Sequence, residues 1–281
     1  MTLSVVIITF NEETNLPRTL EGVKWADEII VVDSLSTDRT VEIAKSYGAK
    51  VFVEPWKGFA AQKNSALEKA TCEWILSLDA DEEVDTALQK QIGEVLEGWK
   101  MFCKYTDQPE CDANRHRWQD DLTASLGAMF DDRFAGSYIR RKNMFLGRWI
   151  RYGGFWPDPK LRFFRRGHAQ FEDRAVHEDA KTNGTTGLLK DGALLHRAYP
   201  TLSSYIEHMN RYSSLGAEMA VAKGRNGFSF VNIVLRPILT FIYNYVFRLG
   251  FLDGREGLLL HLYHSVYVSW KYAKAWELSR K

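Results

Sequence analysis

The first hundred residues alternate between short apolar runs and longer stretches with helical patterning. Continuous β-branched and aliphatic runs are typical of strands that are covered on both faces. Strands are predicted at residues 3–10, 28–33, 50–54 and 73–78. Helices are predicted at residues 11–26, 36–48, 59–71 and 84–97. This alternation predicts an α/β fold with a parallel sheet wrapped by helices.

The pattern weakens after residue 97. Residues 98–136 mix Cys, Asp, His and Trp without a clear period, and we interpret them as an insertion of unknown role. Short extended stretches with Gly and Pro turns follow, and from residue 200 the pattern is helical to the end. The expected organisation is a first half of the main domain, the insertion, a second half and a helical C-terminal extension, at residues 1–97, 98–136, 137–225 and 226–281.

Composition and charge narrow the class of protein. The chain has 281 residues, and its 37 lysines and arginines nearly cancel its 36 aspartates and glutamates, which argues against a nucleic-acid partner. An odd count of three cysteines without paired spacing fits a reducing compartment. The chain opens without a basic segment before its first apolar run, so no signal peptide is expected and we expect a cytoplasmic protein.

The stretch WILSLDADEEV, residues 74–84, aims an apolar strand at four acidic residues. Glu82 and Glu83 are interpreted as acids at the N-terminus of the helix predicted over 84–97. The same interpretation is open for Asp79 and Asp81, but a cap needs one acid rather than two that flank an alanine. Two such carboxylates suit a hard divalent cation, which in turn binds diphosphate oxygens.

Other polar residues are predicted at the same edge of the sheet, because ligands of open parallel sheets bind beyond the carboxyl ends of the strands. They are Thr9, Asn11 and Glu12 after the first strand, Asp33 after the second, and Lys63 and Asn64 on the helix between the third and fourth strands. Asp33 alone is also ordinary turn chemistry, and Lys63 alone is also a solvated helix lysine. Their occurrence together predicts one crevice.

The segments SVVIITFNEE, EIIVVDSLSTDRT, GFAAQKNSAL and WILSLDADE, in this order, resemble glycosyltransferase family 2. That family has the GT-A fold, a Rossmann-like, mostly parallel central sheet flanked by helices, and Asp79-Ala80-Asp81 matches its DXD motif. Later segments, among them residues 138–167 and GFLDGREGLLL, resemble the branch of bacterial lipopolysaccharide inner-core β-glucosyltransferases. The resemblance covers nearly the whole chain and lapses at 98–136.

The resemblance implies an inverting transfer of a hexose, glucose from UDP-glucose, to a lipid-linked saccharide with the help of Mg²⁺ or Mn²⁺. It implies that Asp81 binds the cation. The donor would be bound by Thr9, Asn11, Glu12, Asp33, Lys63, Asn64 and Asp79. Glu178, in the segment AVHE, would be the base that takes the proton from the acceptor hydroxyl.

Alternatives remain for the base and the third metal ligand. Glu172, Asp173, Asp179 and Asp158 are nearby carboxylates, and Glu178 itself could be a surface acid. His177 could orient Glu178 or bind the metal, and His196 is its rival as a ligand. A zinc site from Cys103, Cys111 and His116 is discounted because their spacing fits no standard pattern.

The acceptor is expected in the second half, where arginines alternate with aromatic residues. Trp156, Asp158 and Arg162 are the candidates, since arginine grips phosphate and aromatic rings stack on sugar faces. Arg162 could instead grip the donor diphosphate. About half of the basic residues in this region are expected to be ordinary solvated charges.

Residues 228–252 are apolar for about the length of a membrane span, but Arg236, Pro237 and Arg248 interrupt them. A helix lying in the membrane interface is expected, with Lys271, Lys274 and Arg280 available for anionic headgroups. The partner would then be the inner surface of the cell membrane, with peripheral association. A helix that packs into the core is the alternative.

Two other functions are compatible with single features. A phosphatase of the haloacid dehalogenase type also has two aspartates one residue apart after an apolar strand, but its motif needs Thr or Val where this chain has Glu83. A degenerate scaffold that binds a sugar nucleotide without turnover is the non-enzymatic alternative, against which the intact Asp79, Asp81 and Glu178 argue.

Overall fold

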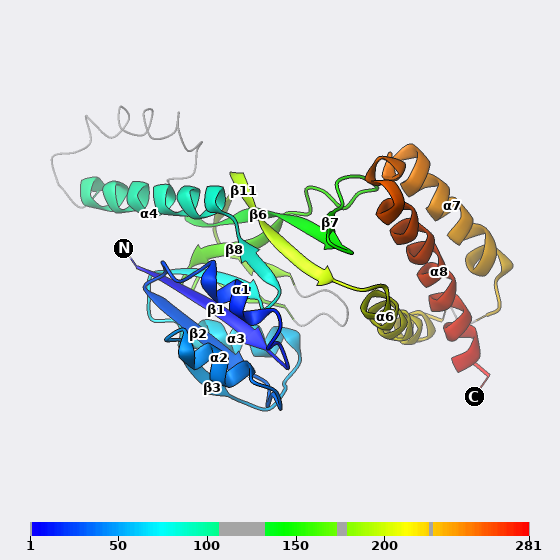
Figure 1. Cartoon of the computed structure of the whole chain (residues 1–281), viewed down its shortest axis with the longest axis horizontal. Coiled ribbons are helices and arrows are strands. Elements are labelled where there is room, and N and C mark those ends of the chain that lie inside the picture. The colour runs from blue at the N-terminus through cyan, green and yellow to red at the C-terminus, as the bar shows by residue number, and fades with distance from the viewer. Residues whose placement is uncertain (1, 107–132, 173–178, 225–226, 281) are drawn as a thin grey trace. The chain divides into compact units, whose positions relative to one another are not determined.

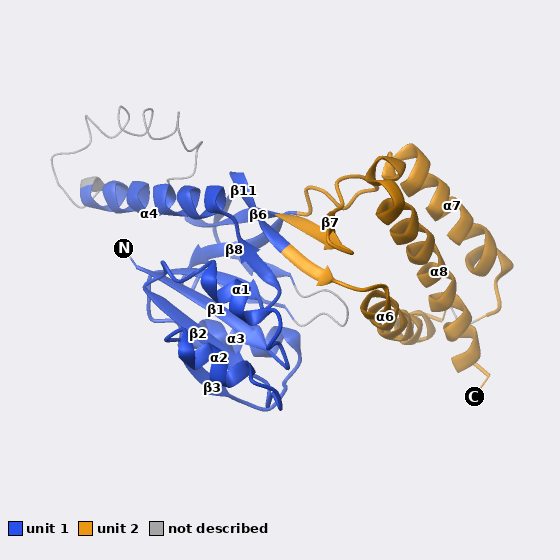
Figure 2. Ribbon diagram, viewed as in Figure 1, with its two compact units in different colours: residues 1–140, 159–174, 178–195 blue, residues 141–158, 175–177, 196–281 orange. Residues whose placement is uncertain are grey.

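The computed structural model describes residues 2–106, 133–172, 179–224 and 227–280. Two compact units divide the chain (Figure 2): unit 1 consists of residues 1–140, 159–174 and 178–195, and unit 2 of residues 141–158, 175–177 and 196–281. These units do not coincide with the four segments expected from the sequence, whose roles remain predictions. Three of the residues with predicted or alternative catalytic roles, Glu178, His177 and Asp173, lie outside the described residues.

The main sheet begins with four parallel strands in the order β3-β2-β1-β4 (Figure 1). They are β1 (Leu3–Thr9), β2 (Glu28–Asp33), β3 (Lys50–Val53) and β4 (Trp74–Asp79). The order continues through β8 (Lys160–Arg165), β6 (Phe134–Phe145), β11 (Thr185–Tyr199) and β5 (Glu82–Val84). β8 is antiparallel to both β4 and β6, so the sheet is mixed. A separate antiparallel pair is formed by β9 (Ala169–Phe171) and β10 (Ala180–Thr182).

Helices cover both faces of the parallel strands, because alternate strand residues face opposite sides. Val5 and Ile7 of β1 share a core cluster with residues of α1 (Leu16–Glu21), α2 (Thr40–Ser46) and α4 (Thr86–Thr106). Val6 of β1 belongs to a second cluster with Ala60 and Ala66 of α3 (Phe59–Lys69). Strands β1, β2 and β4 are therefore buried on both sides, as their continuous apolar runs predicted, whereas the edge strand β3 is largely exposed.

The acidic stretch after β4 folds differently from the expectation. Glu82 and Glu83 lie in the short strand β5 rather than at a helix N-terminus, so their interpretation as cap residues is wrong. Asp85 caps the N-terminus of α4 instead, since its Oδ1 accepts a hydrogen bond of 2.9 Å from the backbone N–H of Leu88. Helix α4 also continues to Thr106, so residues 98–106 are helical rather than irregular.

Unit 2 is helical after residue 200, as expected. It contains α6 (Leu202–Ala222), α7 (Arg236–Ile242) and α8 (Gly254–Leu278), with π-helical turns at Val231–Leu235 (η1) and Tyr243–Phe247 (η2) and a 3₁₀ turn at Gly250–Asp253 (η3). Its strand β7 (Arg148–Trp149) pairs with the end of β6. Within the described ranges, no helix combines the length and hydropathy that crossing a membrane requires.

Candidate functional site

Several of the predicted donor-site residues lie together at the carboxyl edge of the parallel strands. Thr9, the last residue of β1, lies opposite Asp33, the last residue of β2, and Ile8 lies opposite Asp79 at the end of β4. The Oγ1 of Thr9 donates a hydrogen bond of 2.9 Å to the carboxylate of Asp33, and both side chains are buried. The sheet register therefore brings three predicted donor-site residues to one level.

Two loops beyond this edge are fastened to each other. Asn11, at a positive φ of 56°, accepts a hydrogen bond of 2.8 Å from the backbone of Thr37 through its side-chain oxygen. Its own backbone N–H donates to Ser36, whose backbone N–H donates to Asp33 over 2.8 Å. These hydrogen bonds connect the loops after β1 and β2 to each other and to Asp33.

Asp79 lies between two cations of the same unit. Lys63 of α3, which is buried, contacts Asp79 over 2.8 Å, and Arg162 of β8 forms an ion pair with the other carboxylate oxygen. Arg162 also contacts the fully buried Glu82 over 2.9 Å. Burial alone would lower the pKa of the Arg162 guanidinium, but the charges of Asp79 and Glu82 outweigh it and raise that pKa. This cluster of Lys63, Asp79, Glu82 and Arg162 is called the donor-edge cluster below.

Arg162 is 5% exposed and lies against the carboxylates of Asp79 and Glu82. Whether it serves the acceptor or the donor diphosphate stays a prediction. The sequence did not indicate Glu82 as its partner. Arg162 and Glu82 are 80 residues apart in the sequence, and β5 has only three residues, so no local pattern indicates this pair.

Asp81 and Glu12 add negative charge next to this cluster. Burial raises the pKa of the Glu12 carboxyl, and the nearby charges of Asp81, Asp38 and Asp79 raise it further against the lowering effect of a hydrogen bond from Asn15. A cation would relieve this repulsion, and carboxylate oxygens are the donors that Mg²⁺ and Mn²⁺ prefer. The residues present therefore fit a divalent cation at Asp81, completed by diphosphate oxygens and water, although no group of three or more metal-binding side chains is found in the described part of the chain.

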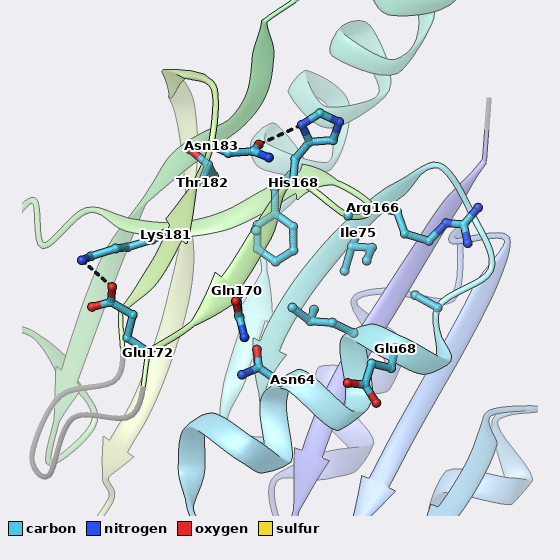
Figure 3. Close-up of a pocket in the computed structure, with 15 residues that line it drawn as sticks. Asn64, Glu68, Ile75, Arg166, His168, Gln170, Glu172, Lys181, Thr182 and Asn183 are labelled. Carbon is cyan, nitrogen blue, oxygen red and sulfur yellow. Dashed lines mark hydrogen bonds and ion pairs between the residues drawn. The ribbon is translucent and has the colours of Figure 1, made fainter.

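Asn64 faces elsewhere, because neighbouring helix residues point about 100° apart. Its side chain exchanges two hydrogen bonds with the backbone of Phe171, at 2.8 and 2.9 Å. It lines a hollow of about 570 Å³ that also contains the His168–Asn183 hydrogen bond and the Lys181–Glu172 ion pair (Figure 3). The structure thus gives Asn64 a contact apart from the donor-edge cluster, and its donor-binding role stays a prediction.

Unit 2 contains a polar network around Asp158. Its carboxylate accepts hydrogen bonds of 2.9 Å from both Arg141 and Asn143, and Asn143 Oδ1 lies 2.7 Å from the ring of His196. These residues line a cavity of about 280 Å³ together with Phe155 and other apolar side chains. His196 is hydrogen-bonded within this network through one ring nitrogen, and its alternative role as a metal ligand stays a prediction.

Trp156 lies in an aromatic and basic cluster of unit 2. Its ring meets that of Trp149 edge to face, with 5.1 Å between the ring centroids. The guanidinium of Arg151 and the ammonium of Lys142 lie over the Trp149 ring at 4.1 and 5.4 Å. Aromatic rings and cations are thus present together in this part of unit 2, and the role of Trp156 in binding an acceptor stays a prediction.

The comparison with family models gives the decisive match. Residues 4–169 match the model of glycosyl transferase family 2, which covers more than half of the chain. The chain belongs to glycosyl transferase family 2. This family match and the mixed sheet with its flanking helices give the chain the GT-A fold, and Asp79-Ala80-Asp81 stands within the matched span.

Individual relatives extend over nearly the whole chain. The lipopolysaccharide core biosynthesis glycosyltransferase LpsC of Rhizobium meliloti is 28% identical over 98% of this chain and 92% of its own length. A glycosyltransferase of Rickettsia typhi is 29% identical over 99% of this chain and 88% of its own. Among solved structures, the mannosyltransferase PcManGT from Pyrobaculum calidifontis in complex with GDP-Man and Mn²⁺ is similar, with 15% identity, 98% and 86% coverage and a TM-score of 0.49.

Proposed function

We propose that this glycosyltransferase transfers glucose from UDP-glucose, with inversion, to a lipid-linked saccharide such as the lipopolysaccharide inner core. The observation that carries the donor side is the meeting of Thr9, Asp33, Asp79 and Asp81 at one edge of the sheet, beside Lys63 and Arg162. The acceptor class rests on the likeness to LpsC along nearly the whole chain. Family membership decides against a haloacid dehalogenase phosphatase.

On the donor side, Asp81 would hold a divalent cation, which would supply neutralisation of the departing diphosphate. Lys63 and Arg162 already hold Asp79 in place, so Asp79 serves the ribose or sugar hydroxyls or supports the cation from a fixed position. Asp33, fixed by Thr9 and Ser36, faces the base or ribose. Asn11 and Glu12 complete the pocket from the loop after β1.

On the acceptor side, no strong general acid would be required, because the cation would stabilise the departing diphosphate. A base must take the proton of the attacking hydroxyl. Glu178 is proposed for this role, with His177 orienting it or binding the cation. Asp158 and Trp156 are proposed to bind the acceptor saccharide, the first through the network with Asn143 and the second through its ring.

A lipid-linked acceptor requires the enzyme to work at a membrane surface. We propose peripheral association of this cytoplasmic enzyme with the inner face of the cell membrane through residues 228–252. These residues expose many large apolar side chains, among them Phe228, Leu239 and Phe247 at 62%, 64% and 73%. Contiguous exposed apolar surface of this kind marks a membrane or protein contact.

The decisive experiment measures UDP binding by calorimetry with and without Mg²⁺ or Mn²⁺, and turnover of UDP-glucose with a glycolipid acceptor. Asp81→Asn should abolish the cation-dependent part of UDP binding and all turnover, whereas Glu83→Gln, a neighbouring acid that pairs with Arg18, should change neither by more than a few fold. Glu178→Gln should retain UDP binding and lose about a hundredfold in turnover. Tight cation-dependent UDP binding by Asp81→Asn would remove Asp81 from the site, and UDP binding without any turnover by the wild type would identify a scaffold.

A further inference from the structure

The segment from η1 through α7 to η2 exposes apolar side chains at every fourth residue. The first row is Val231, Leu235, Leu239, Tyr243 and Phe247. The second row, beside it, is Phe230, Val234, Ile238, Ile242 and Val246. All ten are exposed, by 36% to 73%, and they are called the apolar stripe below.

The opposite side of the segment repeats at the same interval. Pro237 is buried, and Ile233, Phe241 and Tyr245 are partly buried where the segment packs along α8 (Figure 1). The backbone oxygen of Ile233 accepts a hydrogen bond of 2.8 Å from Ser269 of α8. A four-residue period therefore separates a face that packs on α8 from a face covered by nothing in the described structure.

A regular α-helix cannot keep a four-residue row on one side. With 3.6 residues per turn, each step of four residues rotates the row by about 40°, so residues 231 and 247 would differ by about 160°. A π-turn takes more residues per turn and rotates the row in the opposite sense. The chain has π-turns at both ends, Val231–Leu235 and Tyr243–Phe247, around the α-helical Arg236–Ile242. This succession keeps the whole stripe on one face.

The charges around the stripe select its partner. Residues 227–252 contain no aspartate or glutamate, and their two charged residues, Arg236 and Arg248, are both exposed cations. Residues 201–281 contain ten lysines and arginines against five aspartates and glutamates, a net charge of plus five in a chain of plus one. An anionic lipid surface complements both the apolar stripe and this charge, whereas pairing two copies of the stripe would bring like charges together.

We propose that the apolar stripe is the surface that enters the outer part of an anionic bilayer, and that the two π-turns are the device that aligns all of it with the membrane plane. The proposal rests on the proposed function in one respect, which is that a lipid-linked acceptor brings the enzyme to a membrane. Its specific content is the geometry: five successive positions of one row reach the lipid together, which a regular α-helix would not allow.

The test places a nitroxide label on single cysteines at 231, 235, 239, 243 and 247 of the full-length chain, with Cys72→Ala, Cys103→Ala and Cys111→Ser as background. Electron paramagnetic resonance then compares the accessibility of each label to oxygen and to a water-soluble nickel complex, on vesicles of phosphatidylcholine and phosphatidylglycerol. We expect all five labels to become lipid-accessible to similar depth. A label at Glu218, exposed on α6, should stay in water.

Two results would overturn the proposal. If the ends of the row, 231 and 247, stay in water while 239 inserts, the segment is a regular α-helix on the membrane. If none of the labels inserts and ultracentrifugation shows a dimer that Leu239→Gln dissociates, a second copy covers the stripe. Calorimetric UDP binding by the same variants is independent of both results, so a failure of the donor proposal is seen separately.

Matched substitutions test the contribution of the stripe to binding. Leu239→Gln combined with Phe247→Gln should weaken vesicle binding at least tenfold without lowering the melting temperature, because both side chains are exposed. Met101→Gln, an exposed apolar residue on α4 of unit 1, should leave vesicle binding unchanged. Equal effects of both changes would contradict a specific role for the stripe.

Discussion

At the residue scale, the donor-edge cluster depends on Arg162. Its guanidinium is buried and compensates both Asp79 and Glu82, the second of which is fully buried. Removing one partner of a buried ionic group is strongly destabilising, because charge remains in a poorly solvated place. Arg162 and Lys63 together keep the carboxylate of Asp79 between two cations.

We therefore expect Arg162→Met to lower the free energy of unfolding by about 3–5 kcal/mol. Urea denaturation of the wild type and variant measures this difference. Arg166→Met, an exposed arginine just after β8, is the control and should change stability by less than about 0.5 kcal/mol. A loss below about 1 kcal/mol for Arg162→Met would mean that other cations compensate the two carboxylates.

His261 is the second residue with a measurable consequence. It is 1% exposed, lies against Phe155 and Tyr245, and neither ring nitrogen has a hydrogen-bond partner among the described residues. Burial lowers the pKa of His261 to about 4, and the nearby His264 lowers it further while Asp253 opposes the shift. The folded protein therefore favours the neutral form of the His261 ring.

The unfolded chain binds one more proton at His261 between pH 6.5 and about 4. Because of this difference in proton binding, His261 leaves the free energy of unfolding unaffected by pH above about pH 6.5. Between pH 6.5 and about 4 it lowers the free energy of unfolding as the pH falls, by up to about 1.4 kcal/mol per pH unit. His261→Met should flatten the fall of unfolding free energy over that range, measured by urea denaturation at several pH values. An unchanged slope would show that His261 is not the group responsible, and His168→Gln, on unit 1, serves as the control.

At the element scale, the sequence predicted what short-range pattern can encode. Strands β1, β2 and β4 are continuous apolar runs with both faces buried, so the sequence indicated them, and with them the edge at which Thr9, Asp33 and Asp79 meet. Strand β5 was missed because its three residues include two glutamates, which resemble a helix start. The partner of Glu82 is 80 residues away, and the alternation of π and α turns at 231–247 depends on packing against α8. Neither has a local signal.

The contact between α6 and α8 corrects one expectation from the sequence. Lys274 does not face outward for headgroups: its Nζ lies 2.6 to 2.9 Å from oxygens of Asn210, Ser213 and Ser214 on α6. Burial lowers the pKa of Lys274. Its role is to join the two helices beside the packed alanines 217, 220 and 275.

We expect Lys274→Met to lower the free energy of unfolding by about 1–3 kcal/mol, because several α6 acceptors lose their donor. Thermal and urea denaturation measure it. Lys223→Met, an exposed lysine at the end of α6, should be nearly neutral. If Lys274→Met instead leaves stability unchanged and weakens vesicle binding, the side chain serves the lipid after all.

At the scale of the whole molecule, the chain separates its charge by sequence. Residues 1–200 carry a net charge of minus four and residues 201–281 of plus five, which together give the plus one of the chain. In the proposed function, the carboxylates of the donor-edge cluster would need a cation before an anionic nucleotide binds, whereas the basic C-terminal part would suit an anionic surface without one. Donor binding and membrane binding should therefore respond to different changes of the solution.

Salt distinguishes the two. If apolar burial and headgroup attraction act together, binding to anionic liposomes is reversible and weakened by ionic strength, whereas a spanning helix would resist both salt and alkaline carbonate. We expect the full-length protein to float with liposomes at low salt and to be largely released at high salt.

Each basic residue near such a surface contributes about 1 kcal/mol, so Arg255→Glu with Arg280→Glu, both exposed, should weaken binding by a factor of about thirty or more. The matched control, Lys24→Glu with Lys45→Glu on unit 1, makes the same change in net charge and should leave flotation unchanged. If the two pairs act alike, the attraction comes from net charge alone, and if the wild type never floats, the apolar stripe has another partner and the acceptor reaches the enzyme by another route.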